Sequence, residues 1–194
     1  MTRIILCLLA SLVVPLVSLA QDVPVFVVTG PATAITFAVS ASVPIHGTFD
    51  KWDATLTFTS ADVTTGALRI TVQAASVNTG SGLKNATLKG EDFFNVERDP
   101  LITFVSKRVV RTGPETLEIQ GDFTIRGVTK PETLLLTVSG KGTGSGQIKG
   151  TMAFDRKEFG MNSGIPFIRI ADRVEVTVTL EGRRVSGPPL VLRP

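Results

Sequence analysis

The sequence has one cysteine, one histidine, one tryptophan and no tyrosine among its 194 residues, and each shortage excludes some chemistry. Cys7 lies in a segment that we expect to be removed, so thiol catalysis and cysteine metal sites are excluded from the mature chain. His46 has no second histidine with which to form a metal site or a proton relay. Without disulfides the fold must be held by packing alone, which a domain of this size achieves.

Charge is sparse and scattered as well. Lys and Arg total 20 against 17 Asp and Glu, and the nearest approach to a basic cluster is Lys107, Arg108 and Arg111. Basic residues do not alternate with aromatic ones as they do on a nucleic-acid-binding surface. No two carboxylates are spaced to indicate an acid–base pair. We therefore expect neither a nucleic-acid partner nor an enzymatic activity.

The first 20 residues predict an export signal. A positive charge at Arg3 precedes an apolar run over 4–16, and small residues lead up to a cleavage site after Ala20. Pro15 interrupts the run, which is shorter than the roughly 20 residues of a spanning helix. We expect a periplasmic or secreted protein with no integral membrane span after the signal is removed.

The rest of the chain predicts one all-β domain over 21–182, followed by a loose, flexible tail over 183–194 that contains three prolines. Apolar and polar residues alternate, which is typical of antiparallel strands with one wet and one dry face. About eight strands are expected, over 35–39, 56–58, 68–74, 102–104, 117–125, 134–138, 148–154 and 174–180. Closure into a barrel would hide the sheet edges, and an open sandwich remains the alternative.

One stretch, 81–99, departs from this alternation. The spacing of its apolar residues fits helical turns, Ser81 is placed to cap the first turn, and Asp99 precedes a proline that would end the segment. We expect one or two short helices here, which would act as a lid or fill one end of the barrel.

Several blocks of sequence, in the same order, resemble the YceI-like polyisoprenoid-binding family. They span most of the chain from about 35 to 181 and comprise Gly47–Phe49 with Trp52, then 75–80, 88–96, 99–106, 121–131 and 156–161. The resemblance implies a lipocalin-like antiparallel β-barrel whose apolar tunnel holds a long isoprenoid or another amphiphilic lipid. Where the family often has a His-Ser pair, this chain has Thr33 and Ala34, so no headgroup role of that pair transfers.

Candidate ligand-binding residues follow from the inward face of the strands and from the helical insertion. The chain has 11 phenylalanines, so its aromatic residues bring few polar groups into the interior. Ordinary core packing is the alternative interpretation for each candidate. The candidates are Phe37, Phe49, Trp52, Phe58, Ile70, Val72, Phe93, Phe94, Phe104, Phe123, Ile125, Leu136, Phe154 and Phe159.

Four basic residues are candidate headgroup contacts: His46, Arg126, Lys130 and Arg156. Guanidinium groups match the geometry of an anionic head such as a pyrophosphate. The alternative for Arg126 and Lys130 is a solvated turn, and for His46 an exposed position. No cofactor is expected, and the ligand would be a polyisoprenoid, an isoprenoid quinone or a fatty amphiphile.

Two functions therefore stay open at this point. The first is non-enzymatic binding, transport or sequestration of a lipid in a hollow barrel. The second is a structural or stress-related interaction protein with a solid core and no bound lipid. Whether the chain forms a homodimer is left open by its sequence.

Overall fold

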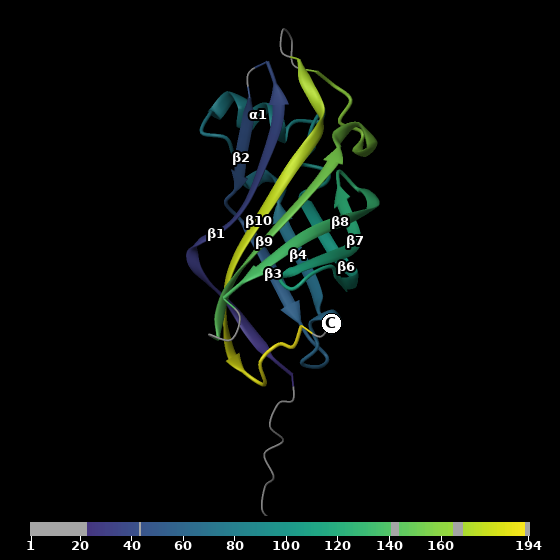
Figure 1. The fold of residues 1–194 in the computed structure, drawn as a ribbon. Coiled ribbons are helices and arrows are strands. Elements are labelled where there is room, and N and C mark those ends of the chain that lie inside the picture. Colours follow the sequence, from purple (N-terminus) through teal and green to yellow (C-terminus); the bar gives the residue numbers. More distant parts are fainter. Residues whose placement is uncertain (1–22, 43, 141–143, 165–168, 193–194) are drawn as a thin grey trace, which may run out of the picture.

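The computed structural model describes residues 23–42, 44–140, 144–164 and 169–192, and the expected export signal lies outside them. In this part of the chain a single ten-stranded sheet curls into a half-barrel (Figure 1). Its strands are β1 (Val25–Ala41), β2 (Ile45–Phe49), β3 (Trp52–Thr57), β4 (Ala67–Gln73), β5 (Val77–Asn78), β6 (Leu101–Arg111), β7 (Thr116–Ile125), β8 (Val128–Ser139), β9 (Ser145–Asp155) and β10 (Ile170–Ser186).

All the strand pairs of this sheet are antiparallel, in the order β3-β4-β6-β7-β8-β9-β10-β1-β2-β5. From β6 to β10 each strand pairs with the next along the chain. The long pairing of β10 with β1 then brings the two ends of the domain side by side (Figure 1). The edge strands are β3 and β5. We call the end where β1 begins and β10 ends the lower end, and the end that carries α1 (Gly82–Lys89) the upper end.

The alternation that predicted the strands places one face of the sheet inside. Along β7, Leu117, Ile119, Phe123 and Ile125 are buried, while Gln120 between them is exposed. Burial of such side chains contributes roughly 25 cal/mol for each Å² of apolar surface removed from water. The predicted antiparallel β-fold is therefore confirmed, and the hydrophobic core is the interior of the half-barrel.

Two strands escaped prediction, so the sheet has ten strands rather than about eight. They are β2, with five residues, and β5, with two. Segments this short contain too few residues for a period of two to stand out. β2 lies beside β1, and β5 follows β2 at the edge of the sheet, where Phe49 pairs with Val77. Because all ten strands form one sheet, the sandwich alternative is wrong.

The helical insertion is α1 followed by turns. The Ser81 hydroxyl accepts a hydrogen bond from the backbone N–H of Lys84, which is the cap expected from the sequence. The helix ends at Lys89 with Gly90 as its C-cap, and the backbone N–H of Phe94 then donates to the Leu88 carbonyl at 2.9 Å. This bond turns Phe93 and Phe94 back into the half-barrel, where both are buried.

The strand at the C-terminal side runs past the expected domain boundary. β10 continues to Ser186, and its Arg183 and Arg184 still pair with β9 or β1. Beyond it, Val191 forms an isolated parallel bridge with Asp62, next to the 3-10 turn η1 (Val63–Thr65). Leu190 and Leu192 pack against the core on either side of this bridge. The segment expected as a loose tail thus contributes ordered contacts as far as Leu192.

Candidate binding cavity

The upper half of the interior is nearly filled by side chains. A cavity of about 100 Å³ remains there, and its described lining is apolar except for Thr103 and Arg156. Such a volume is too small for a long chain, since ligand pockets usually measure about 300–1,000 Å³. The upper half is therefore close to an ordinary packed core.

Phenylalanine rings account for this filling. Phe94 from the α1 insertion meets Phe37 at 6.4 Å and Phe49 at 5.8 Å between ring centroids. Phe37 lies over Gly47, where a Cβ would come within 2.5 Å of the ring. A second cluster joins Phe123, Phe154 and Phe159 at 5.0–5.4 Å. Edge-to-face and tilted pairs of this kind contribute beyond their buried area.

Polar contacts connect the segments at the upper end. The Arg126 guanidinium, on a turn residue with a φ of 54°, donates to the carbonyl of Gly160 at 2.6 Å and to that of Asp92 at 3.5 Å. The Ser163 hydroxyl donates to the Asp92 carboxylate at 2.7 Å. These bonds tie the turns after α1 to the segment that follows the 3-10 turn η3 (Arg156–Phe159).

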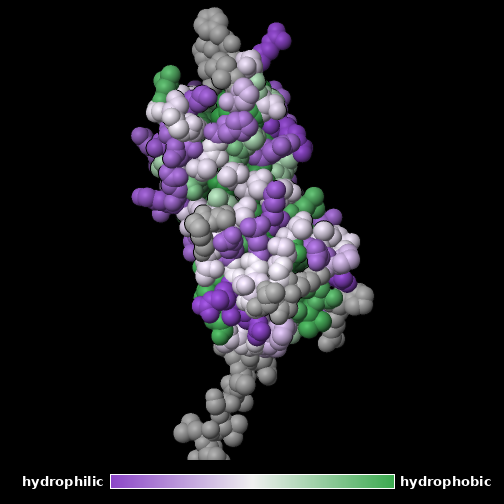
Figure 2. All heavy atoms as spheres, turned by 60° about the vertical axis from the view of Figure 1, so that its left-hand side comes forward, coloured by the Kyte–Doolittle hydropathy of each residue, from purple (hydrophilic) through white to green (hydrophobic). Residues whose placement is uncertain are grey.

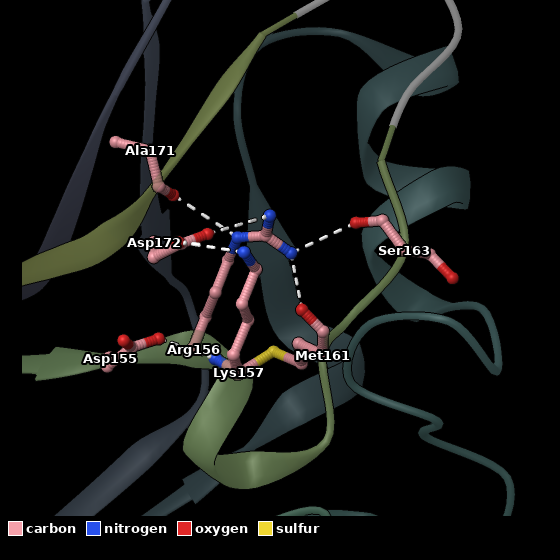
Figure 3. Close-up of polar contacts among 7 residues, drawn as sticks. All are labelled: Asp155, Arg156, Lys157, Met161, Ser163, Ala171 and Asp172. Atoms are coloured by element: carbon pink, nitrogen blue, oxygen red, sulfur yellow. Dashed lines mark hydrogen bonds and ion pairs between the residues drawn. The ribbon is translucent and has the colours of Figure 1, made fainter.

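Arg156 is a buried cation that organises the same end (Figure 3). Its guanidinium donates to the carbonyls of Met161, Ser163 and Ala171 and to the Asp172 carboxylate at 3.3 Å. Burying a charge is costly unless it is paired and hydrogen-bonded, and here four oxygens supply that compensation. Arg156 thereby joins η3 to β10, and its role in headgroup binding stays a prediction.

The lower half of the interior is different because it holds a cavity of about 750 Å³. Its walls are mainly apolar side chains of the inward-facing strand positions. Exposed residues such as Val27, Val28 and Val191 also line it, so the cavity reaches the protein surface at the lower end. Figure 2 shows hydrophobic side chains gathered at this end of the molecule.

One side wall of the lower cavity lies between β1 and the edge strand β3. There the ring of Phe26 on β1 meets the ring of Phe58, just after β3, at 6.0 Å between centroids. Below them the C-terminal segment crosses the opening, held by hydrogen bonds from Val191 N to Ala61 O at 2.7 Å and from Val63 N to Val191 O at 3.1 Å. Polar groups of the lining include Asp53, Glu181 and Arg184.

The predicted ligand-binding residues divide between these places. Two line the lower cavity, Phe58 and Leu136, while Trp52 and Phe159 line neither cavity. The other ten line the small upper cavity: Phe37, Phe49, Ile70, Val72, Phe93, Phe94, Phe104, Phe123, Ile125 and Phe154. All fourteen are core or partly buried positions, and their contact with a ligand stays a prediction.

The remaining headgroup candidates lie away from the lower opening. His46 is exposed on β2, between the buried or half-buried residues Ile45 and Gly47. Lys130 forms an ion pair with Glu158 at 3.0 Å. Next to that pair, burial raises the pKa of the Glu132 carboxyl; the Glu158 charge raises it further and Lys130 opposes both.

Sequence reasoning missed most of the lower cavity. Its walls include Leu68, Val109, Leu117 and Leu180, together with a series of glycines in and beside β8, β9 and β10. A glycine inside a strand places no side chain on the sheet surface, so it leaves room or admits a neighbour. The available signal was therefore the run of strand glycines, exemplified by Gly146, Gly150 and Gly182.

Within the described residues, every helix is too short or too polar to cross a bilayer. The same part of the chain has no group of three or more His, Cys, Asp and Glu side chains placed to hold a metal ion.

A curled antiparallel sheet with one helix among its described elements and an apolar interior is a lipocalin-type fold. Residues 26–182 match the family model of the YceI-like domain, and the chain belongs to this family. The family resemblance predicted from the sequence blocks is thereby confirmed.

Individual relatives agree with this assignment. The chain is 30% identical over 143 residues to a UPF0312 protein of Pseudomonas syringae pv. tomato, which covers 71% of this chain and 73% of the relative. It is 37% identical over 98 residues to protein YceI of Escherichia coli O157:H7, or 50% of this chain and 51% of that one.

Solved structures show the same fold. BcnA of Burkholderia cenocepacia superposes with a TM-score of 0.71 at 25% identity, covering 79% of this chain and 98% of that one. A polyisoprenoid binding domain from Saccharophagus degradans superposes with a TM-score of 0.63 at 15% identity, covering 82% and 98%.

Proposed function

We propose that this protein binds the hydrocarbon tail of a long isoprenoid or a similar amphiphile in its lower cavity, and that it does so without catalysis. The observation that carries this proposal is the cavity itself, which measures about 750 Å³ and has mainly apolar walls. A space of this size and character is typical of small-molecule binding sites.

The energetics favour an apolar tail. Each Å² of hydrocarbon removed from water contributes roughly 25 cal/mol, so a few hundred Å² give about 5–10 kcal/mol before the tail is ordered. A polar substrate would find few partners, because the walls offer mostly Leu, Val and Phe side chains. Ordering costs reduce the gain but leave useful affinity.

The ligand would enter tail first from the lower end, leaving its head at the opening. The lower cavity offers about 750 Å³ and reaches the surface at this end, whereas only about 100 Å³ is free in the upper half. Glu181 and Arg184 line the cavity from the last part of β10, which ends at the lower end, and a guanidinium is suited to an anionic head. In this orientation Arg184 becomes a headgroup candidate that the sequence did not indicate.

Among hydrocarbon ligands we favour an isoprenoid, with isoprenoid quinones and fatty amphiphiles as close alternatives. Support comes from the Saccharophagus degradans domain, which is described as binding polyisoprenoid and shares this fold. The pattern of residues 1–20 further supports export, and with it a periplasmic or secreted location. The competing function, a solid barrel with no lipid, fits the packed upper half but not the lower cavity.

A pair of variants on β3 tests the proposal. Ala54 lines the lower cavity, so Ala54→Phe fills part of it, whereas Thr57→Phe adds the same ring at an exposed position of the same strand. Geranylgeraniol binding is measured by native mass spectrometry and by competition with a fluorescent fatty probe. We expect binding to the unmodified protein and to Thr57→Phe, with at least a tenfold weaker affinity for Ala54→Phe. Binding that is absent from the unmodified protein, or equal in both variants, overturns the proposal.

A further inference from the structure

Two side chains lie where the linings of the lower and upper cavities meet. Leu134 on β8 and Val178 on β10 line both cavities, and they are the residues that the two described linings share. Their exposed fractions are 1% and 6%, so both are firmly packed. Each lies on a strand that flanks β9 in the sheet.

Gly150, on the intervening strand β9, allows this arrangement. It pairs with Val178 on one side and with Leu136 on the other. A Cβ at Gly150 would lie 2.8 Å from Leu136 Cδ2 and 3.1 Å from Leu134 Cδ1. The leucine side chains of β8 therefore lie over the position where β9 has no side chain, which is a recognised use of glycine inside a strand.

We propose that Leu134, packed over Gly150, and Val178, paired with Gly150 across the strands, form a partition that sets the length of the hydrocarbon chain this protein prefers. This inference rests on the proposed function. A tail entering from the lower end meets the partition, beyond which only about 100 Å³ is free. Carbon atoms in excess of the cavity length stay at the opening in water, where they add no hydrophobic affinity.

Three variants change the partition in known directions. Leu134→Ala removes most of its side chain and joins the two cavities, so longer tails gain about fourfold in affinity for each further methylene buried. Val178→Ala opens the same boundary by a smaller amount and serves if Leu134→Ala does not fold. Gly150→Ala displaces the flexible ends of Leu134 and Leu136 from β9 toward the cavity and shortens the accepted tail.

Leu117→Ala is the matched control. Leu117 is as well buried as the partition residues, with an exposed fraction of 4%, but it lines the lower cavity alone. The substitution removes the same atoms as Leu134→Ala and widens the lower cavity without opening the partition. A general effect of lost leucine packing would appear in both variants, whereas a change in preferred length is expected from Leu134→Ala alone.

The experiment is a competition titration of farnesol, geranylgeraniol and solanesol against the full-length protein and each variant. We expect the affinity ratio of the longer to the shorter alcohol to rise at least tenfold in Leu134→Ala, to rise less in Val178→Ala and to fall in Gly150→Ala. Equal ratios in Leu134→Ala, Leu117→Ala and the unmodified protein overturn the partition but leave lipid binding intact. If the unmodified protein binds none of the alcohols, the proposed function fails and the partition fails with it.

Discussion

The Asp172 carboxylate forms ion pairs with two cations that differ in burial, the buried Arg156 at 3.3 Å and the half-exposed Lys157 at 2.9 Å. The two ion pairs share one carboxylate, yet they are expected to differ in energy. Arg156 also donates to three backbone carbonyls, while Lys157 makes its pair at the surface (Figure 3).

Substitution of these two residues separates a buried cation from a surface one. Arg156→Met leaves three carbonyls without their donor and the Asp172 carboxylate with Lys157 alone, and we expect a loss of about 3 kcal/mol in the free energy of unfolding. Lys157→Ala breaks an exposed pair and should cost less than about 1 kcal/mol. Urea denaturation measures both. Equal losses would show that Arg156 does not organise the upper end.

The ring of Phe94 is expected to anchor the α1 insertion. Phe94→Ala removes its contacts with Phe37 and Phe49 and leaves a void, which typically costs about 3–5 kcal/mol. Leu83→Ala, on α1 but 80% exposed, should change stability by no more than about 0.5 kcal/mol. Thermal and urea denaturation test the pair. A cost for Phe94→Ala as small as that for Leu83→Ala would contradict the packed upper half.

The bridge between Val191 and Asp62 is expected to slow the release of ligand. Val191→Pro abolishes the N–H that donates to Ala61 O, while Val191→Ala keeps it. Loss of one hydrogen bond is worth about 1 kcal/mol, so the dissociation rate of geranylgeraniol should rise roughly fivefold in Val191→Pro. Stopped-flow displacement measures the rate. Equal dissociation rates in the two variants would show that the C-terminal segment does not slow ligand release.

Glu132 gives the stability a defined dependence on pH. The pKa of Glu132 is raised in the folded state. Its contribution to the free energy of unfolding is therefore present below the ordinary pKa of 4.5 and is lost as the pH rises through the raised pKa. Glu132→Gln mimics the protonated form and should be more stable than the unmodified protein at pH 7, by less than about 1 kcal/mol. Below pH 4 the two should coincide. If Glu132→Gln is less stable than the unmodified protein at pH 7, the raised pKa of Glu132 does not destabilise the folded state as argued.

Alternation in the sequence was enough to predict most of the sheet. The residues from Leu117 to Ile125 repeat with a period of two over a whole strand, and the structure places them as expected. β2 and β5 were missed because five and two residues carry almost no period. Ser81 was recognised as a cap because its bond is local in sequence.

The candidate site was harder to predict, because a cavity depends on which side chains are absent. Phenylalanines such as Phe37 and Phe123 drew attention as walls, yet they fill the upper half of the half-barrel. Space in the lower half depends on Gly150 and its neighbours, whose significance appears only when the strands are in register. The contacts of Arg156 were equally hard to predict, because turns bring its carbonyl partners together from separate parts of the sequence.

The measurement that tests the central claim most directly is extraction of the purified, unmodified protein with organic solvent, followed by mass spectrometry of the extract. We expect a prenyl or fatty chain in near-stoichiometric amount, reduced in protein that carries Ala54→Phe. A clean extract, together with failure of the emptied protein to take up geranylgeraniol, would contradict the claim that the lower cavity holds a hydrocarbon chain.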